Sequence, residues 1–540
     1  MTRARINRRT FLVGSSAVVL AACAAPGAST APAASAAAAA KPKPGGTFVY
    51  ASEKDFTPLV PATSTGHQTH RLLANMYEGL VREDLHDTKS TSLKTVPWLA
   101  ESWTISPDGL QYTFKLRQGV KFHDGTPFDA DAVKANYDRC NTESSPFFDK
   151  AAKPLTAQIF DFVAKGEVID KYTWRYTLKS PIGEFLRLLN DRLLLIASPA
   201  ALQKWGNQAI ADHPTGTGPF KFVERIAGQR IVMEKNADYW GGAPYLDKVI
   251  VTIIIDPQAR LAALRSGEVD WVLEMLPDQA EVYRKDPNVS LVYQPIPHTW
   301  FWMLNYREGP TAKKEVRQAL NYAWNREALT KGLMKDLAAP ALSPAPPNNP
   351  SSPPAKAYTY DPAKAKQLLK DAGYPNGFDM TVMYPITGIN DELNSLIQAD
   401  FKQIGVNVKL DKFENSAFLT AARLGVPATH GALQTNWTTN AQLGFWLEQM
   451  FSSKLRPPSG NNRGWYASPE ADKLMDAARP ITDPDLSAAA YRKVLDQIVE
   501  DAPWLWVFHD RNPVAVHKRV RGLDIAATPY YDLQPVWIDR

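Results

Sequence analysis

Two pairs of residues have the types and the spacing that chemistry could use. His67 and His70 stand three residues apart, so on a helix they would share a face and could hold a metal ion. No further ligand can be identified beside them, and we predict no metal site. His123 and Asp124 could exchange protons, but Gly125 follows them directly and the stretch is more typical of a turn.

Local signatures of two large classes of enzyme are absent from the sequence. It contains no G-x-S-x-G nucleophile motif and no G-x-x-x-x-G-K-[ST] phosphate loop. The stretch 216–218 (Gly-Thr-Gly) leads into a strand pattern and not into a helix that could hold a phosphate, which predicts a turn. Nothing singles out acids such as Glu143 or Asp149 as catalytic. We predict no enzymatic activity and no cofactor, although many active sites lack a local signature.

Aromatic residues are the more informative feature. The chain has 15 Trp, 20 Tyr and 21 Phe, and tryptophans recur in its second half, at Trp300, Trp302, Trp437, Trp446, Trp504 and Trp506. Such side chains offer a large contact area with a polar edge, which suits a ligand cleft. The alternative for any single tryptophan is a place in the hydrophobic core, and that is the more common one.

Length and charge limit the class of protein. The 540 residues leave room for two to four domains. Lys and Arg number 61 against 56 Asp and Glu, but four of the basic residues precede Cys23, so the remainder is almost neutral. A near-neutral chain is not expected to bind nucleic acid. The only other cysteine, Cys140, is predicted to be a small buried apolar residue.

The first residues have the pattern of an export signal. A basic stretch precedes an apolar run that is too short to span a bilayer, which predicts a signal peptide over 1–22. Arg8-Arg9-Thr10-Phe11-Leu12 resembles a twin-arginine signal, and Leu20-Ala21-Ala22-Cys23 resembles a lipobox. We therefore predict a lipid anchor on Cys23, a flexible Ala- and Pro-rich tether over 23–44, and a place in the cell envelope or periplasm. A signal peptide without lipidation is the alternative.

Strand and helix patterns alternate in the rest of the chain. Residues 103–116 read as a β-hairpin around a Ser-Pro-Asp-Gly turn, and Asp129 is expected to cap a helix through Tyr137. Residues 249–272 read as a strand, a helix capped by Asp256 and a returning strand. The stretch 361–412 reads as helix, strand, helix, strand, which implies a parallel sheet and an α/β fold.

Five segments, taken together, match the pattern of one protein family in order. They are AESWTISPDGLQYTFKLRQGVKFHDGTPFDADAVKANYDR (100–139), TGTGPFKFVERIAGQRIVMEKNADYWGGAPYLDKVIV (215–251), VRQALNYAWNREAL (316–329), YDPAKAKQLLKDAGYPNGF (360–378) and APWLWVFHDRNPVAV (502–516). On these residues the chain resembles the family 5 extracytoplasmic solute-binding proteins, the peptide- and nickel-type receptors of ABC importers.

The resemblance implies a two-lobe periplasmic-binding-protein fold of the large type, with an extra subdomain and two hinge segments. Lobe I would comprise 45–80, 205–297 and 502–540, the extra subdomain 81–204, and lobe II 298–501. A ligand in the cleft would favour a closed arrangement of the lobes. The expected partners are the permease and ATPase of an importer, and the protein itself is expected to be a monomer that contacts the membrane through its lipid only.

The resemblance also implies a binding site. Peptide-binding members carry a segment like Gly-Trp-x-Ala-Asp-Tyr on lobe II, in which the aspartate pairs with the α-amino group of the ligand. The matching residues here are Asn436, Trp437, Thr438 and, at the position of the aspartate, Asn440. An amide carries no negative charge for a buried ammonium group. We therefore predict a non-peptide or blocked-amine ligand, such as an oligosaccharide or a conjugate, with a di- or oligopeptide as the alternative.

Further contacts to the ligand are predicted from the ends of strands. Tyr384 ends a strand of the expected parallel sheet, where loops meet ligands. Trp504, Trp506 and Phe508 would share one side of a strand, facing either the cleft or the core.

The sequence thus predicts a small-solute receptor of an ABC importer. An exported hydrolase on the same fold and a receptor that signals to a membrane sensor are the alternatives. Uptake of nickel or haem is less favoured, because no cluster of ligands for either is visible.

Overall fold

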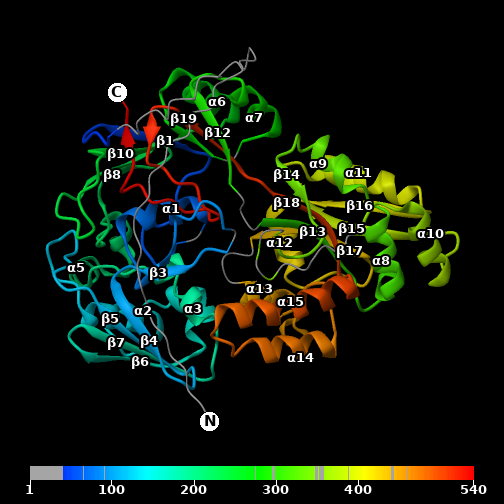
Figure 1. Cartoon of the computed structure of the whole chain (residues 1–540), viewed down its shortest axis with the longest axis horizontal. Helices are drawn as coiled ribbons and strands as arrows, with labels where there is room; N and C mark the ends of the chain where they lie inside the picture. The colour runs from blue at the N-terminus through cyan, green and yellow to red at the C-terminus, as the bar shows by residue number, and fades with distance from the viewer. Residues whose placement is uncertain are drawn as a thin grey trace, which may run out of the picture. The chain divides into compact units, whose positions relative to one another are not determined.

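A computed structural model describes residues 41–539, except 65, 91, 274, 295–297, 347–348, 350, 352–357, 387, 439–442 and 459 (Figure 1). The side chains of Ser416 and Thr438 also lie outside the description. The predicted signal peptide, the lipid anchor on Cys23 and most of the tether lie outside the described residues, as does Asn440. From Pro42 onward the chain is one compact unit.

A seven-stranded sheet contains the first strand of the unit. Its order is β12-β19-β11-β1-β10-β9-β8. The strands are β1 (Thr47–Ser52), β8 (Phe220–Ile226), β9 (Arg230–Lys235), β10 (Lys248–Ile253), β11 (Trp271–Val272), β12 (Val289–Tyr293) and β19 (Pro513–His517). β1 runs parallel to both of its neighbours, and the other pairs are antiparallel.

The predicted strand–helix–strand unit of this sheet is confirmed. The side chain of Asp256 accepts the N–H of Ala259 and starts α6 (Pro257–Ser266). The helix ends at Gly267, whose φ of 77° is a left-handed conformation that suits glycine. The chain then returns in β11, on the far side of β1 from β10.

A second large sheet has six strands in the order β14-β18-β13-β17-β15-β16. Its strands are β13 (His298–Leu304), β14 (Ala338–Pro340), β15 (Phe378–Pro385), β16 (Val406–Phe413), β17 (Ala432–Thr438) and β18 (Trp504–Asp510). Its helices are α8 (Lys314–Tyr322), α9 (Arg326–Lys331), α10 (Pro362–Asp371), α11 (Asn390–Lys402), α12 (Asn415–Ala422), α13 (Leu443–Phe451), α14 (Pro469–Ala478) and α15 (Pro484–Asp501). The predicted helix–strand–helix–strand stretch is confirmed as α10, β15, α11 and β16, and β15 is parallel to β16.

The place of β18 corrects one boundary of the predicted division. The sequence analysis predicts that residues 502–510 belong to lobe I with the rest of the C-terminal segment. In the structure β18 pairs with β13 and β14 inside the six-stranded sheet. The C-terminal segment therefore contributes β18 to the sheet of lobe II before it enters the seven-stranded sheet as β19. Figure 1 shows β18 beside β13, although some 200 residues separate them.

A four-stranded antiparallel sheet carries the predicted hairpin, which is confirmed. Its order is β4-β5-β7-β6, from β4 (Ala100–Ile105), β5 (Gln111–Leu116), β6 (Val163–Asp170) and β7 (Thr173–Leu178). Asp129 caps α2 (Ala130–Asn141), which extends four residues beyond the predicted end. The remaining elements are α1 (His67–Met76), α3 (Ala152–Phe160), α4 (Phe185–Leu188), α5 (Pro199–Ala209), α7 (Pro277–Arg284), β2 (Val81–Glu83), β3 (Thr95–Pro97), β20 (Val520–Arg521) and β21 (Trp537–Ile538).

Two segments of chain connect the seven-stranded sheet to the six-stranded sheet. One runs from β12 to β13 and the other from β18 to β19. They contact each other, because Gln294 N donates to Asn512 O at 3.1 Å and Asn512 Nδ2 donates to Gln294 Oε1 at 3.2 Å. Among the described residues, no helix is long and apolar enough to cross a membrane.

Candidate ligand-binding site at the edge of the six-stranded sheet

Three strands of the six-stranded sheet meet at the edge from which the connecting segments leave. His298, the first residue of β13, pairs with Thr438 at the end of β17. On the other side of β13, Thr299 pairs with His509, next to the last residue of β18. In open α/β sheets ligands bind outside the carboxyl ends of strands, so this edge is the first place to examine.

A network of polar side chains joins these three strands. His298 Nδ1 bonds to a carboxylate oxygen of Asp510, and His298 Nε2 lies 3.1 Å from Asn436 Oδ1. Trp300 Nε1 donates to the same oxygen of Asp510 at 2.9 Å. The side chains of His298 and Asp510 are 23% and 21% exposed, so both remain within reach of a ligand.

An arginine lies over Trp437 on the same strand. The Arg463 guanidinium is 5.9 Å from the ring centroid of the half-buried Trp437, within the range of a cation–π contact. Burial and the nearby Arg423 lower the pKa of Arg463. Arg463 makes one side-chain hydrogen bond, to Asn461 Oδ1 at 3.2 Å, and no ion pair with any described residue. Strand β17 is therefore joined to the Asp510 carboxylate through His298, which contacts Asn436, and has a guanidinium beside Trp437.

Tyr384 is also placed at the end of a strand, but its hydroxyl is occupied. The residue is fully buried, and its hydroxyl donates to Asp391 Oδ1 at 2.6 Å. Burial is the main cause that raises the pKa of Tyr384 above its usual range. Lys412 Nζ holds the other oxygen of Asp391 at 2.9 Å. The predicted contact of Tyr384 with a ligand remains a prediction, and this placement favours a supporting role.

The aromatic residues of β18 lie in the hydrophobic core. Trp504, Trp506 and Phe508 have at most 2% of their surface exposed. Phe508 stacks on Trp300 with 5.2 Å between ring centroids, and so packs beneath the polar network. This placement favours the core alternative for Trp504 and Trp506. Of the predicted binding segment, Asn436 and Trp437 reach the sheet edge, the backbone of Thr438 pairs with His298, and Asn440 lies outside the described residues.

One histidine from each of the two patterns in the first part of the chain, His70 and His123, contacts a backbone carbonyl group. His70 Nε2 lies 3.3 Å from Ser64 O, and burial lowers its pKa. His123 Nε2 bonds to Gly218 O at 2.9 Å, and burial lowers the pKa of His123 to about 4. Gly218 itself approaches the backbone of Met76 so closely that a Cβ atom would lie 2.7 Å from its carbonyl carbon. Among the described residues, no three His, Cys, Asp or Glu side chains are grouped to hold a metal ion.

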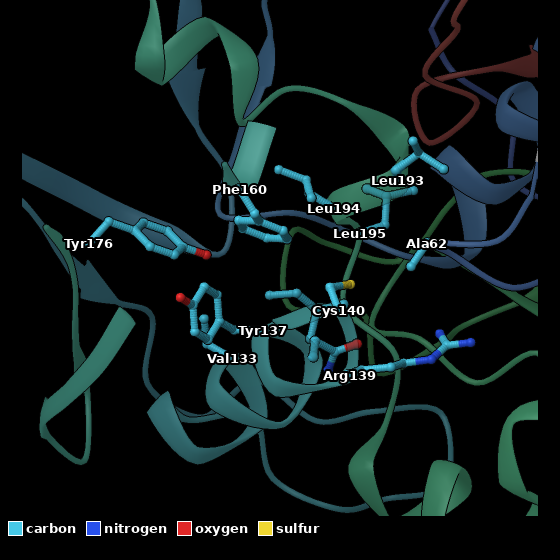
Figure 2. A pocket seen from close by; sticks show the side chains of 12 residues that line it. Ala62, Val133, Tyr137, Arg139, Cys140, Phe160, Tyr176, Leu193, Leu194 and Leu195 are labelled. Carbon is cyan, nitrogen blue, oxygen red and sulfur yellow. The ribbon is translucent and has the colours of Figure 1, made fainter. Parts of the chain in front are cut away.

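A cavity beside the four-stranded sheet is too small for a solute. Figure 2 shows Val133, Tyr137 and Cys140 of α2 facing Phe160, Tyr176 and Leu195 around it. Its volume is about 30 Å³, which is the space for one water molecule. We therefore place the candidate site at the sheet edge and not in this cavity. His298 and Asp510 are the residues of that edge that the sequence analysis missed.

Comparisons with known proteins agree over nearly the whole chain. The family model of bacterial extracellular solute-binding proteins, family 5, matches residues 94–467. The glutathione-binding protein GsiB of Pectobacterium atrosepticum is 34% identical over 482 residues, which cover 88% of this chain and 90% of that protein.

Solved structures show the same likeness. DppA of Helicobacter pylori, determined in complex with the peptide STSA, has a TM-score of 0.76 at 30% identity and covers 92% of this chain and 99% of its own. HbpA2 of Haemophilus parasuis has a TM-score of 0.82 at 26% identity, with 91% and 100% covered. The likeness confirms the expected two-lobe α/β fold.

Proposed function

We propose a ligand class for a chain that belongs to family 5 of the bacterial extracellular solute-binding proteins. A member of this family is the extracytoplasmic solute-binding component of an ABC importer and is not an enzyme. The ligand that we propose is a short peptide of the glutathione class, captured at the edge of the six-stranded sheet as the two lobes close.

The charges at the sheet edge are the observation that carries this proposal. Asp510 offers a partly exposed carboxylate beside His298, and Arg463 offers a guanidinium beside Trp437 that forms no ion pair within the part of the chain that the structure describes. A short peptide carries ammonium and carboxylate groups, and buried charges need partners of opposite sign. The names of the relatives, which bind glutathione and the peptide STSA, support the same class.

A ligand with a blocked amine, or an oligosaccharide, is the second candidate. The family resemblance puts Asn440 at the position where peptide-binding members carry an aspartate, and an amide cannot balance an ammonium group. Under the first candidate, Asp510 supplies the negative charge instead. The two candidates therefore differ in whether the ligand needs a free amine.

The remaining parts of the proposal concern place and architecture. We propose that residues 1–22 are a twin-arginine-like signal peptide and that Cys23 carries the lipid anchor. We also propose that the four-stranded sheet belongs to an extra subdomain of lobe I over 81–204. A permease and an ATPase on separate chains would receive the solute.

Isothermal titration of the purified chain tests the ligand. We expect saturable binding of reduced glutathione or of the tetrapeptide STSA at one site per chain, with the peptide recovered unchanged. N-acetylated glutathione should bind at least about tenfold more weakly if Asp510 holds the amine. Equal binding of the acetylated form would favour the blocked-amine candidate. Binding of a disaccharide alone would overturn the peptide proposal, and conversion of the peptide would favour a hydrolase.

Variants of the sheet edge test the site separately from the ligand. Asp510→Asn and Trp437→Ala should each weaken peptide binding at least about tenfold, because they remove a charge and a contact face. Trp205→Ala is the control, since Trp205 is also half-buried but stacks on His213 and lies in α5, away from β17 (Figure 1). Unchanged binding in both site variants would place the ligand elsewhere, while the ligand class would stand.

A further inference from the structure

A glutamate of the four-stranded-sheet region reaches across to a helix of the six-stranded-sheet region. Glu184 stands directly before α4, and its carboxylate accepts two backbone N–H groups of α13. Phe445 N donates to Oε2 at 2.7 Å and Gly444 N donates to Oε1 at 3.2 Å. These groups belong to the first turn of α13, where backbone N–H groups have no partner within the helix. Charge-assisted bonds of this kind are among the stronger hydrogen bonds in proteins.

The preceding residue brings the two backbones into direct contact. Gly183 N donates to Arg479 O at 2.8 Å, just beyond the end of α14. A Cβ atom at position 183 would lie 1.8 Å from Ile481 O, a separation that no side chain tolerates. Only glycine therefore fits at position 183 while the backbone of Ile481 lies this close. Near it, Phe162 meets Phe445 edge to face at 6.3 Å.

A second carboxylate, Glu448, and the guanidinium of Arg479 lie beside Glu184 in this contact. Glu448, one turn along α13, receives two bonds from Arg479 Nε, at 3.0 and 3.1 Å. Glu184, Glu448 and Arg479 line one small cavity of about 20 Å³ with Tyr491. Burial raises the pKa of Glu184, and the hydrogen bonds from α13 oppose that rise. The half-buried carboxylate is thus stabilised by the charge of Arg187, which is the larger opposing cause, together with these bonds.

Helix α13 is the next described element after β17, which carries Asn436 and Trp437. Any contact that fixes the first turn of α13 restrains the chain that leaves the candidate site. The contact also links the four-stranded-sheet region to the six-stranded-sheet region at a place other than the two connecting segments (Figure 1). A contact of this kind can exist only when the two regions are close together.

We propose that Glu184 is a positioning residue that latches the two lobes in the closed arrangement. Its carboxylate holds α13 from the opposite lobe, and Gly183 provides the space for the approach. The proposal rests on the proposed closure of the lobes and not on the identity of the ligand. When the lobes separate, the first turn of α13 loses its acceptor and Glu184 becomes solvated.

Hydrogen–deuterium exchange of the ligand-free full chain tests the latch. Glu184→Ala and Gly183→Ala should each raise the exchange rates of the Gly444 and Phe445 amides at least about tenfold, since the acceptor is lost or displaced. Glu184→Gln should give a smaller rise, because its amide oxygen still accepts one bond. Glu143→Gln is the control, since Glu143 is an exposed acid of the same region that pairs with Lys153. Unchanged exchange at both amides in Glu184→Ala would overturn the proposal.

Small-angle scattering separates a latch from a simple helix cap. The radius of gyration of the ligand-free protein should increase in Glu184→Ala and in Gly183→Ala, while exchange in β4–β7 stays as in the parent chain. Faster exchange without a larger radius would mean that Glu184 only caps α13, and would overturn the latch. Gly183→Ala and Glu184→Gln keep the test decisive if Glu184→Ala does not fold. None of these readouts needs glutathione, so a failed ligand proposal leaves the result interpretable.

Discussion

Trp504 of β18 stacks on Phe301 of the adjacent strand β13, with ring centroids 3.6 Å apart and ring planes inclined by 11°. Both residues are almost completely buried. Trp446 of α13 and Phe451 at its end also contact the Trp504 ring, at 5.7 and 4.4 Å between centroids. Trp504 is therefore enclosed by strands and helix, with no face left for a solute.

Replacing Trp504 with alanine should destabilise the protein without directly removing a ligand contact. We expect a loss of about 3–5 kcal/mol in the free energy of unfolding, which is typical of a buried Trp replaced by Ala. Urea unfolding followed by circular dichroism measures this loss. Trp437→Ala, at the half-buried sheet edge, should cost less than about 1.5 kcal/mol because little buried surface is lost. A Trp504→Ala protein of unchanged stability that no longer bound peptide would place Trp504 in the binding site.

The parts of the fold that the sequence predicted are those that local chemistry determines. Asp129 and Asp256 each accept a backbone N–H group at the start of a helix, as their positions in the sequence indicated, and Asp361 does the same. Gly267 and Gly405 follow the ends of helices in left-handed conformations, as expected for glycine. Signals of this kind act over a few residues, so a single sequence contains all of the information that they need.

The candidate site depends on contacts that the sequence does not display. His298 and Asp510 are 212 positions apart, and only the pairing of β13 with β18 brings them together. Whether an aromatic side chain of a strand lies in the core or faces a ligand likewise depends on which elements cover each face of the sheet. Alternation showed that Trp504 and Trp506 share a side, but it could not show that α13 and its neighbours cover that side. The binding segment around Trp437 was found through the family resemblance, not through periodicity.

Glu78 should make the stability of the protein depend on pH. The residue is fully buried, and it accepts hydrogen bonds from Tyr239 Oη at 2.7 Å and from Trp240 Nε1 at 2.8 Å. Burial raises the pKa of Glu78 to about 7 although these bonds and the nearby Arg82 lower it. Between the ordinary glutamate pKa and about 7, the folded state therefore binds more protons than the unfolded state. Stability should fall as pH rises through this range.

Comparison with Glu78→Gln isolates this contribution. The free energy of unfolding of the parent chain, relative to that of Glu78→Gln, should decrease by about 3 kcal/mol between pH 4.5 and pH 8. Urea unfolding at several pH values measures the difference. Glu101→Gln, at an exposed position, should show no such trend. A difference between parent and Glu78→Gln that stayed constant with pH would contradict the prediction.

Cys140 should be inert toward thiol reagents in the folded protein. The side chain is buried beside the cavity of Figure 2, and burial raises the pKa of its thiol to about 11. The thiolate is the reactive form, so at pH 8 the raised pKa alone lowers the reactive fraction at least about a hundredfold relative to a free cysteine.

In a Cys23→Ser chain, Cys140 should react with Ellman's reagent at pH 8 at least that much more slowly than free cysteine. It should react completely once guanidinium chloride unfolds the chain. A cysteine introduced at the exposed Ala151, close by in the sequence, should react at the ordinary rate. Rapid modification of Cys140 in the native chain would show that α2 opens readily from the four-stranded sheet.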